Sequence, residues 1–476
     1  MKIKFKLAAM LSTALLAFSL LSGCVEKPQE DVQNSDWEGK EEFTASDRYT
    51  DAVKALEARY NDYLEKTELG FAQTDPTDES FFETDRVDGG VKITAYVGDD
   101  EIVIIPETIG GLEVKEIGEG AFASKNMKAV SVPDTVKFTG KGAFENCNSL
   151  TSIRLPFIGD GQDITHFGYI FGADSYENHP LRVPTSLDIV IIGGSGRAIA
   201  ENAFAGCKSL SAVAVPDTVE EIERFAFYEC LDLVYFDSSS SVKSVGEYAF
   251  GHCTTLFTAN FDKAQSIGMG AFYGCSSMRN LSLPFVGENP EENRFLGYIF
   301  GAEVADYNDE FVPASLYSVK LSGCDEIPDR AFASCKYIGE FILEEGIETI
   351  GARAFYACRS IIEISLPDTV KVIGDDAFFG CDNLVDIDFG SGVEKIGMQA
   401  FFGCRALERV EIPYKVTEIK ASTFALCINL KRVTLNNVSK VGKEAFRSCN
   451  ALEAVDCEGI EVAEGNSALV LIAPEE

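Results

Sequence analysis

The sequence predicts a repeat solenoid with a parallel β-sheet on its concave face and short helical or 3-10 turns on its convex face. Ala-Phe-x-x-Cys recurs along the chain, in full at 203–207. From Phe204, the repeat phenylalanines follow at steps of 23, 23, 22, 60, 23, 23, 23, 23 and 22 residues. After each Cys comes Leu-x-x-Ile-x-Leu, whose last two apolar positions alternate as in a strand with one buried face. A fixed period of this size indicates stacked coils that share one core.

Composition places the chain among folded proteins and limits its partners. The 476 residues are 46% hydrophobic and 25% charged, which is typical of a folded protein. The formal net charge is −35, from 41 basic and 76 acidic residues. This acidity argues against nucleic acid or anionic lipid headgroups as partners, because their phosphates would be repelled.

The first 23 residues have the pattern of an export signal. Three lysines, Lys2, Lys4 and Lys6, precede a short apolar core at 7–21, which is too brief for a permanent membrane span. The segment ends in Leu-Ser-Gly-Cys at 21–24, which resembles the lipobox of bacterial lipoproteins. That resemblance implies removal of residues 1–23 and a lipid on Cys24 as the only membrane anchor. Loss of three lysines would change the net charge from −35 to −38.

Three segments are expected between the lipid and the repeats. Residues 24–45 are the lipidated Cys and a polar, acidic stretch without an apolar period, which predicts a tether. Residues 46–70 are expected to contain a helix, with Ser46 as its N-cap, and residues 71–90 a loop. The helix would carry one apolar stripe that either covers the first coil or binds another helix; the stripe is Tyr49, Val53, Leu56, Tyr60 and Tyr63.

The ends of the solenoid are expected to be covered by β-structure. At 91–116 we expect an N-terminal β cap, in which 91–97 and 102–105 pair as a hairpin through the Gly-Asp-Asp turn at 98–100. The repeats at 117–460 correspond to about 14 coils. Residues 461–476 are expected to form a C-terminal cap with a closing strand at 469–473.

Two intervals of 60 residues, after Phe144 and after Phe272, interrupt the period and are copies of each other. Each contains Gly-Tyr-Ile-Phe-Gly, at 168–172 and at 297–301. We interpret each interval as two coils, with Phe171 or Phe300 in the Phe position. The extra residues are expected to be loops at 158–167, 173–186, 286–295 and 302–315.

Eleven of the 14 cysteines follow a repeat Phe by three residues. The sequence contains no Cys-x-x-Cys and no Cys/His cluster with the spacing of a zinc site. We therefore expect a row of buried thiols that act as small apolar side chains, and no metal or other cofactor. Two further cysteines, Cys324 and Cys457, stand outside this register.

The repeat unit, best seen at 347–367, resembles the BspA-like class of leucine-rich repeats. The resemblance covers about residues 91–460, with small departures at Lys125 in place of Cys and Thr423 in place of Ala. It implies a bacterial cell-surface protein with a parallel-stranded solenoid. Members of the class are associated with adhesion to host matrix proteins or contact with other cells. The class offers no catalytic residues to transfer to this chain.

The free strand positions form one candidate binding surface. Tyr235 and Phe257 are aromatic residues on an otherwise polar sheet, which suits a binding hot spot, although single exposed apolar residues are also ordinary surface. The central row of the sheet is expected to run through Arg154, Ile191, Ala214, Asp237, Asn260, Ser282, Lys320, Ile342, Ser365, Asp388, Glu411, Thr434 and Asp456.

Two further candidate surfaces carry charged or loop residues. Near the C-terminus, Asp388, Glu411 and Arg432 belong to a mixed-charge face that is either a contact patch or solvated surface. The long loops carry Tyr176, His179 and Tyr307, and loops on a rigid scaffold commonly serve recognition. They could equally be solvated spacers.

Catalysis finds no support in the sequence. None of the three histidines is part of a recognisable Ser/His/Asp triad sequence or of a His-Glu-x-x-His motif. The prediction is therefore a non-catalytic, lipid-anchored surface protein that binds an extracellular protein partner, in adhesion or in cell–cell contact. The alternative is a glycan-binding surface lipoprotein in which Tyr235 and Phe257 stack on sugars.

Overall fold

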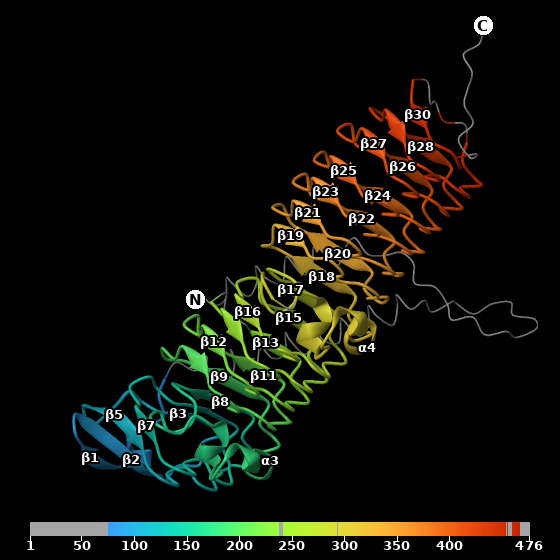
Figure 1. The fold of residues 1–476 in the computed structure, drawn as a ribbon. Coiled ribbons are helices and arrows are strands. Elements are labelled where there is room, and N and C mark those ends of the chain that lie inside the picture. The colour runs from blue at the N-terminus through green and yellow to red at the C-terminus, as the bar shows by residue number, and fades with distance from the viewer. Residues whose placement is uncertain (1–74, 238–240, 293, 454, 456–458, 467–476) are drawn as a thin grey trace, which may run out of the picture. The chain divides into compact units, whose positions relative to one another are not determined.

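The computed structural model describes residues 75–237, 241–292, 294–453, 455 and 459–466 (Figure 1). The predicted export signal, tether, helix at 46–70 and closing strand at 469–473 lie outside these ranges. Cys24 and Cys457 lie outside them as well. Within the described ranges, no helix has the length and apolar character needed to cross a bilayer.

Each coil contributes a strand of three or four residues that pairs in parallel with the strands of neighbouring coils. These strands form sheets in the orders β13-β11-β9-β8-β6-β3, β15-β17-β18-β20, β22-β24 and β26-β28. Their bounds are β3 Ile102–Ile104, β6 Ala129–Ser131, β8 Ser152–Leu155, β9 Ile189–Ile192, β11 Ala212–Ala214, β13 Tyr235–Asp237, β15 Thr258–Asn260, β17 Asn280–Leu283, β18 Ser318–Leu321, β20 Glu340–Leu343, β22 Glu363–Ser365, β24 Asp386–Asp388, β26 Arg409–Glu411 and β28 Arg432–Thr434.

The register of these strands confirms the predicted central row. Asp388 pairs with Ser365, and Glu411 pairs with Thr434. Within each of the two longer sheets, the pairings also align the predicted positions: Arg154, Ile191, Ala214 and Asp237 in one, and Asn260, Ser282, Lys320 and Ile342 in the other. Only Asp456 lies outside the described residues.

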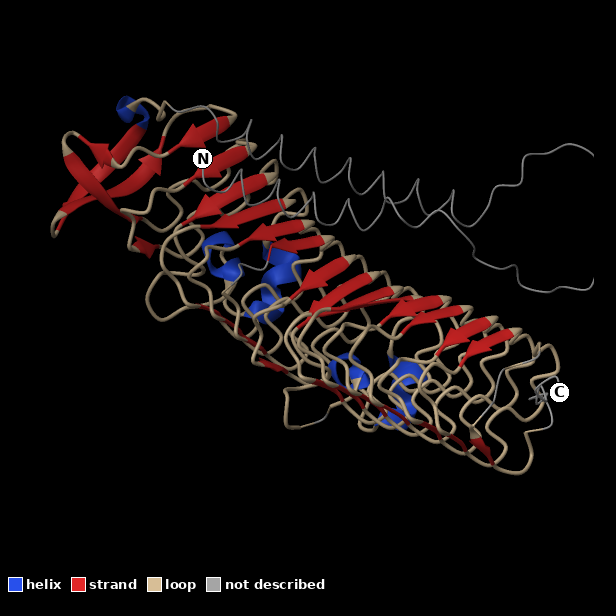
Figure 2. Ribbon diagram, turned by 90° about the horizontal axis from the view of Figure 1, so that it is seen from above, coloured by secondary structure: helices blue, strands red, loops and turns tan. Residues whose placement is uncertain are grey.

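A second series of two-residue strands follows the first in most coils, and this series was not predicted. Figure 2 shows the two rows of strands along the stack, with turns and short helices between them. Glycine follows most of these strands because the backbone of the preceding coil is close; a Cβ on Gly374 would lie 2.6 Å from the Ala352 nitrogen. The strands are β7 Phe138–Thr139, β10 Ala198–Ile199, β12 Glu221–Ile222, β14 Ser244–Val245, β16 Ser266–Ile267, β19 Glu326–Ile327, β21 Thr349–Ile350, β23 Val372–Ile373, β25 Lys395–Ile396, β27 Glu418–Ile419, β29 Lys440–Val441 and β30 Glu461–Val462.

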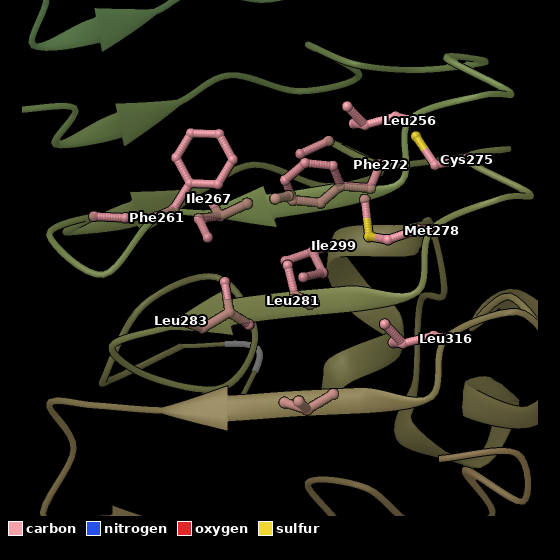
Figure 3. Packing of buried hydrophobic residues seen from close by; sticks show 14 of the residues in the cluster. Leu256, Phe261, Ile267, Phe272, Cys275, Met278, Leu281, Leu283, Ile299 and Leu316 are labelled. Atoms are coloured by element: carbon pink, nitrogen blue, oxygen red, sulfur yellow. The ribbon is translucent and has the colours of Figure 1, made fainter. Parts of the chain in front are cut away.

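The Ala-Phe-x-x-Cys segments form tight turns on the return path of each coil, and we call the side of the stack that they form the turn edge. Their phenylalanines are fully buried and stack on one another from coil to coil. Phe355 and Phe378 are 4.9 Å apart between ring centroids, with an interplanar angle of 10°. Figure 3 shows Phe272, Cys275 and Met278 directed into the shared interior. Burial of each ring contributes about 2–3 kcal/mol, so the row of rings supplies much of the stacking energy.

The N-terminal cap differs from its prediction. Residues expected as a loop form a 3-10 turn, η1 (Glu79–Phe81), and a strand, β1 (Phe82–Val87). The strand β1 pairs antiparallel with β2 (Gly90–Tyr96), across a turn at Asp88-Gly89 in which Gly89 has φ of 73°. This Asp-Gly pair is a strong hairpin signal, but the polar residues of β1 concealed the strand.

The predicted hairpin between 91–97 and 102–105 is therefore wrong. The strand β2 pairs on its other side with β5 (Leu112–Ile117), which also pairs with β4 (Thr108–Ile109), whereas β3 joins the long strand series through β6. Tyr96, at the end of β2, stacks on Phe122 with centroids 5.5 Å apart. An aromatic ring of the cap thus begins the row of stacked phenylalanines.

The two 60-residue intervals each hold a buried coil and an insert. The 3-10 helices η2 (Phe167–Phe171) and η4 (Leu296–Phe300) bury Phe171 and Phe300, as predicted. The segments predicted as loops at 173–186 and 302–315 also contain short helices, which are too short to produce a helical period in the sequence. These are η3 (Tyr176–Asn178), α3 (His179–Arg182), η5 (Ala305–Tyr307) and α4 (Asn308–Phe311).

Near the end of the described residues, the Asn466 side chain pairs with backbone groups of the turn at 442–449. The Asn466 Oδ1 accepts a hydrogen bond from the Phe446 backbone N–H at 3.0 Å, and its Nδ2 donates to the Gly442 carbonyl at 2.9 Å. In earlier coils, the backbone of the next turn accepts the equivalent N–H; Phe424, for example, donates to the Ala445 carbonyl. The amide therefore pairs with backbone groups that, in earlier coils, are paired with the backbone of the following turn.

Candidate binding surfaces

The four C-terminal strands of the long series present the most exposed part of the strand face, which we call the open strand face (β22, β24, β26 and β28). In each, the first and third residues reach outward while the second is buried. The buried residues, Ile364, Ile387, Val410 and Val433, belong to the core. The outward residues form two columns: Glu363, Asp386, Arg409 and Arg432, and Ser365, Asp388, Glu411 and Thr434.

Ion pairs between neighbouring coils organise the first column and its flank. The Arg409 guanidinium contacts both oxygens of the Asp386 carboxylate, at 2.9 and 3.3 Å. This hydrogen-bonded guanidinium lowers the pKa of Asp386. Beside them, the Lys431 ammonium lies 3.2 Å from the Glu408 carboxylate. Such exposed pairs add little stability, so their main effect is to fix a pattern of charge on the surface.

The second column supplies two exposed carboxylates, Asp388 and Glu411. Asp388 lies at the end of β24 and accepts a hydrogen bond from the Gly390 N–H at 3.0 Å. Glu411 occupies the corresponding position of β26. Arg432 pairs in register with Arg409, one coil further on. The structure thus brings the three predicted charged residues onto one continuous face of four coils.

The predicted aromatic site lies on neighbouring coils of the strand row and is less exposed. Tyr235 begins β13, Phe257 directly precedes β15, and both side chains are half-buried. Asp237 and Asn260 end the same two strands, where Asn260 is exposed and its Oδ1 accepts the Asp262 N–H at 3.2 Å. Half-burial leaves each ring only part of its surface for a ligand.

The insert residues divide into two kinds. Tyr176, the first residue of η3, is 39% exposed, and Tyr307, the last residue of η5, is 46% exposed. His179, in contrast, is fully buried, which corrects its prediction as a recognition residue. Its Nδ1 lies 2.8 Å from the Ala205 carbonyl oxygen and its Nε2 lies 3.2 Å from His166 Nδ1. It therefore fastens α3 to the next turn.

The second insert has Asn308 where the first has His179. Asn308 is also fully buried. Its Oδ1 accepts the Gly297 N–H at 2.7 Å, and its Nδ2 donates to the Ala333 carbonyl at 3.1 Å. Ala333 and Ala205 both directly follow a repeat Phe, so the two side chains hold equivalent carbonyls. A buried histidine and a buried asparagine thus have the same structural role.

A third surface, on the turn edge, escaped the sequence prediction. Five rings from three successive turns lie together there: Phe225, Tyr228, Tyr248, His252 and Tyr273. They directly precede or follow the buried Ala-Phe-x-x-Cys positions, where the repeat pattern imposes no residue type. The available signal was the recurrence of aromatic residues at these free positions in consecutive repeats.

A hollow of about 340 Å³ lies along the loop that follows β17. Its walls include Phe285, Pro290, Arg294 and the half-buried Cys324. Arg294 pairs with Glu326 at 3.1 Å. Burial raises the pKa of the Cys324 thiol to about 11, which keeps it protonated at neutral pH. Across the described part of the chain, no three His, Cys, Asp or Glu side chains are placed to hold a metal ion.

Stacked parallel coils, a row of buried rings and an open strand face define a leucine-rich-repeat solenoid. The family model described as BspA type leucine rich repeat region matches residues 105–164, 184–297 and 315–457, with six copies. The chain therefore belongs to the BspA-type leucine-rich-repeat family. No curated protein matches it significantly.

Several solved structures resemble the chain. One is a leucine-rich repeat protein from Bacteroides ovatus, with 23% identity, 76% of this chain and 99% of that chain covered, and a TM-score of 0.34. Another is a leucine rich cell surface protein from Faecalibacterium prausnitzii, with 24% identity, coverage of 82% and 95%, and a TM-score of 0.28. The pneumococcal vaccine antigen PcpA shares 16% identity, with coverage of 82% and 95% and a TM-score of 0.25.

Proposed function

We propose that this protein is exported, anchored by a lipid on Cys24, and binds an extracellular protein partner through the open strand face. Its role would be adhesion or cell–cell contact, without catalysis. Membership of the BspA-type leucine-rich-repeat family supports a surface protein engaged in protein interactions. The sequence at 1–24, with its charged start, apolar core and lipobox-like end, supports export and lipidation.

The observation that carries the proposal is the alternation on β22, β24, β26 and β28. In each strand, a buried residue lies between two residues that face outward. The buried residue anchors the strand to the core and so fixes the backbone that carries the two outward side chains. A partner that docks here meets side chains whose backbone is already ordered, which reduces the entropy lost on binding. The paired strands give the partner a continuous surface of four coils.

The charge of this face indicates the chemistry of the partner. Glu363, Asp388 and Glu411 are exposed carboxylates, whereas Asp386 is already neutralised by Arg409. The net charge of the whole chain is −35. A partner with a basic docking surface would therefore be steered toward the face, and its association rate should fall as salt is added.

The direct test uses surface plasmon resonance with the exported chain and purified fibronectin, fibrinogen, laminin and collagen, in low and physiological salt. We expect salt-dependent binding to at least one of them. In the variant with both Asp388→Lys and Glu411→Lys, affinity for that partner should fall at least tenfold, because two attractive carboxylates become repulsive ammonium groups.

A matched variant separates the site from the net charge. Glu221→Lys with Glu394→Lys makes the same charge change at exposed positions of the short strand series and its approach. Affinity should stay within twofold of the parent chain. Absence of binding to every protein of the panel, or equal losses in the two double variants, would contradict the proposal.

The lipid anchor has its own test. In a bacterial host, the full-length chain should partition into the membrane fraction and incorporate labelled palmitate. Cys24→Ser should abolish the label and release the chain into the soluble exported fraction. Cys324→Ser serves as the control, since it also removes one thiol but leaves 21–24 intact. Membrane attachment that survives Cys24→Ser would refute lipidation at this residue.

A further inference from the structure

The five aromatic residues on the turn edge, Phe225, Tyr228, Tyr248, His252 and Tyr273, form a closed circuit that we call the aromatic platform. Each ring contacts two others of the set. The centroid distances are 5.3 Å for Phe225–Tyr228, 5.5 Å for Tyr228–His252, 5.1 Å for His252–Tyr273, 5.9 Å for Tyr273–Tyr248 and 5.6 Å for Tyr248–Phe225. Four of these pairs are edge-to-face, and Tyr248 stacks on Phe225.

Glycines of the following turns provide the surface on which three of these rings rest. A Cβ on Gly251 would lie 2.8 Å from Tyr228 Cδ2. On Gly270 it would lie 2.7 Å from Tyr248 Cε1, and on Gly274 it would lie 2.7 Å from His252 Nδ1. The rings therefore lie directly against backbone, where any larger residue would displace them. A ligand would meet rings that are already fixed in place.

The aromatic platform is separate from the rings that hold the stack together. Phe227, Phe250 and Phe272 of the same three turns are fully buried and stack on each other in the core. Four rings of the platform are half-buried, and the fifth, Tyr273, is 37% exposed. Neighbouring aromatic rings that are each partly exposed offer a ligand a larger apolar area than a single exposed ring does.

Charged groups border the aromatic platform. The Arg224 guanidinium lies 4.6 Å from the centre of the Phe225 ring, and its Nε lies 3.4 Å from the Glu247 carboxylate. Glu229, which follows Tyr228 in the chain, pairs with Lys208 at 3.7 Å. The arrangement is a cluster of mostly perpendicular aromatic rings, bordered by carboxylates and cations. A sugar ring has matching chemistry, with C–H groups on its faces and hydroxyls at its edge.

The dimensions also favour a saccharide over a peptide. Neighbouring coils in a parallel stack are about 4.8 Å apart, so three coils span about 10 Å, which is the length of two pyranose rings in an extended chain. A polyproline peptide advances about 3.1 Å per residue and would not repeat in step with the coils. The acidity of the chain disfavours sulfated or sialylated glycans.

We propose that the aromatic platform binds a neutral, extended β-linked oligosaccharide, with successive sugar rings contacting the aromatic side chains of successive coils. This site is independent of the open strand face and of the protein partner proposed above. It also differs from Tyr235 and Phe257, the residues from which the sequence predicted sugar stacking.

Saturation-transfer difference NMR with the exported chain tests the proposal. The probes are cellohexaose and chitohexaose, with deca-proline as the peptide probe. We expect saturation of the sugar C–H protons for at least one hexasaccharide and none for deca-proline. In the variant Tyr228→Ala with Tyr273→Ala, the affinity should fall at least tenfold. The conservative pair Tyr228→Phe with Tyr273→Phe should lose less than fivefold, because the ring faces remain.

Two further variants distinguish an effect on the binding site from an effect on folding. Gly251→Ala should also weaken binding, because it displaces the Tyr228 ring without removing one. Phe379→Ala is the matched control: on the same edge, Tyr356, Phe379 and Phe402 stack face to face at 4.9 and 4.7 Å, so their faces are occupied by each other. The Phe379 variant should bind as the parent chain does.

Three outcomes would overturn the proposal. They are no transfer to either hexasaccharide, binding that survives the double Tyr→Ala change, and an equal loss in the Phe379 variant. Binding of deca-proline in place of the sugars would assign the aromatic platform to a peptide. Circular dichroism melts of all variants identify any that fail to fold.

Discussion

The thiol of Cys381 donates a hydrogen bond to the backbone carbonyl oxygen of Phe355, with Sγ and O 3.2 Å apart. Phe355 belongs to the preceding coil, so the bond joins two successive turns. The same Cys–Phe bond recurs in eight other pairs: Cys147–Phe122, Cys230–Phe204, Cys253–Phe227, Cys275–Phe250, Cys358–Phe332, Cys404–Phe378, Cys427–Phe401 and Cys449–Phe424. The repeat thus uses cysteine as a small buried donor that links coils without a disulfide.

Removal of this donor should weaken the stack. Cys381→Ala deletes a buried sulfur and leaves a small void, so the free energy of unfolding should fall by about 1–2 kcal/mol. Urea denaturation followed by circular dichroism measures it. Cys324→Ala, outside the row and half-buried, should cost less than half as much. Equal effects of the two substitutions would show that the coil-to-coil bond adds nothing.

A left-handed backbone conformation recurs two residues after each repeat Phe, and it predicts opposite effects of two substitutions. Ala357 has φ of 56°, whereas Gly403 holds the same position with φ of 74°. Ala357→Gly should stabilise by up to about 1 kcal/mol, and Gly403→Ala should destabilise by about 1 kcal/mol.

Thermal melts of the two variants check this prediction. A Cβ on Gly403 would have no heavy atom closer than 4.0 Å, so any loss in that variant reflects backbone strain and not a clash. Shifts of the melting temperature in the same direction for both substitutions would contradict this explanation.

The buried thiols should resist modification. Eleven described cysteines are buried, and Cys324 is half-buried. Burial raises the pKa of the Cys147 thiol to about 11 and that of Cys449 to about 12, so the reactive thiolate is scarce at pH 8. Iodoacetamide at pH 8, followed by mass spectrometry, should label Cys324 slowly and the eleven others only after denaturation in urea. Rapid labelling of the native row would refute its burial.

The two inserts should differ in their response to acid. Burial lowers the pKa of His179 to about 4, below its ordinary value of 6.5. The unfolded chain therefore binds a proton more readily than the folded one, and stability should fall as the pH drops from about 6.5 to about 4. This loss amounts to at most about 3 kcal/mol and is complete below pH 4.

His179→Asn tests this acid response, because Asn308 already fills the equivalent position of the second insert. The variant should lose less stability than the parent chain between pH 7 and pH 4.5 in urea titrations. The neighbouring His166, whose pKa is also lowered by burial, remains in both proteins. An unchanged pH dependence would show that His179 does not titrate with unfolding.

Much of the fold was predictable because the same residue spacing and the same strand alternation recur in successive repeat units. The regular spacing of the repeat phenylalanines from Phe204 to Phe446 predicted the stacked coils. The alternation of apolar and free positions in segments such as 363–365 predicted the strand row and its register. The Asp88-Gly89 hairpin was missed because β1 alternates weakly. The helices α3 and α4 were missed because four residues show no period.

The candidate surfaces were predictable only in part. Asp388, Glu411 and Arg432 lie on one face as expected, because strand alternation alone places them there. His179 was predicted to lie in a loop, yet its side chain is buried. It is held there by a hydrogen bond to the carbonyl of Ala205, which is 26 residues away in the sequence. The aromatic platform depends on rings and glycines from three different coils.

The sequence by itself determined the period, the parallel strand row and the buried Phe and Cys positions, because each follows from alternation or spacing within one repeat. Only the tertiary structure decided which free positions are exposed, which polar residues are buried and which rings meet. Those features depend on contacts between residues about 22 positions apart, and a repeat pattern leaves such contacts open.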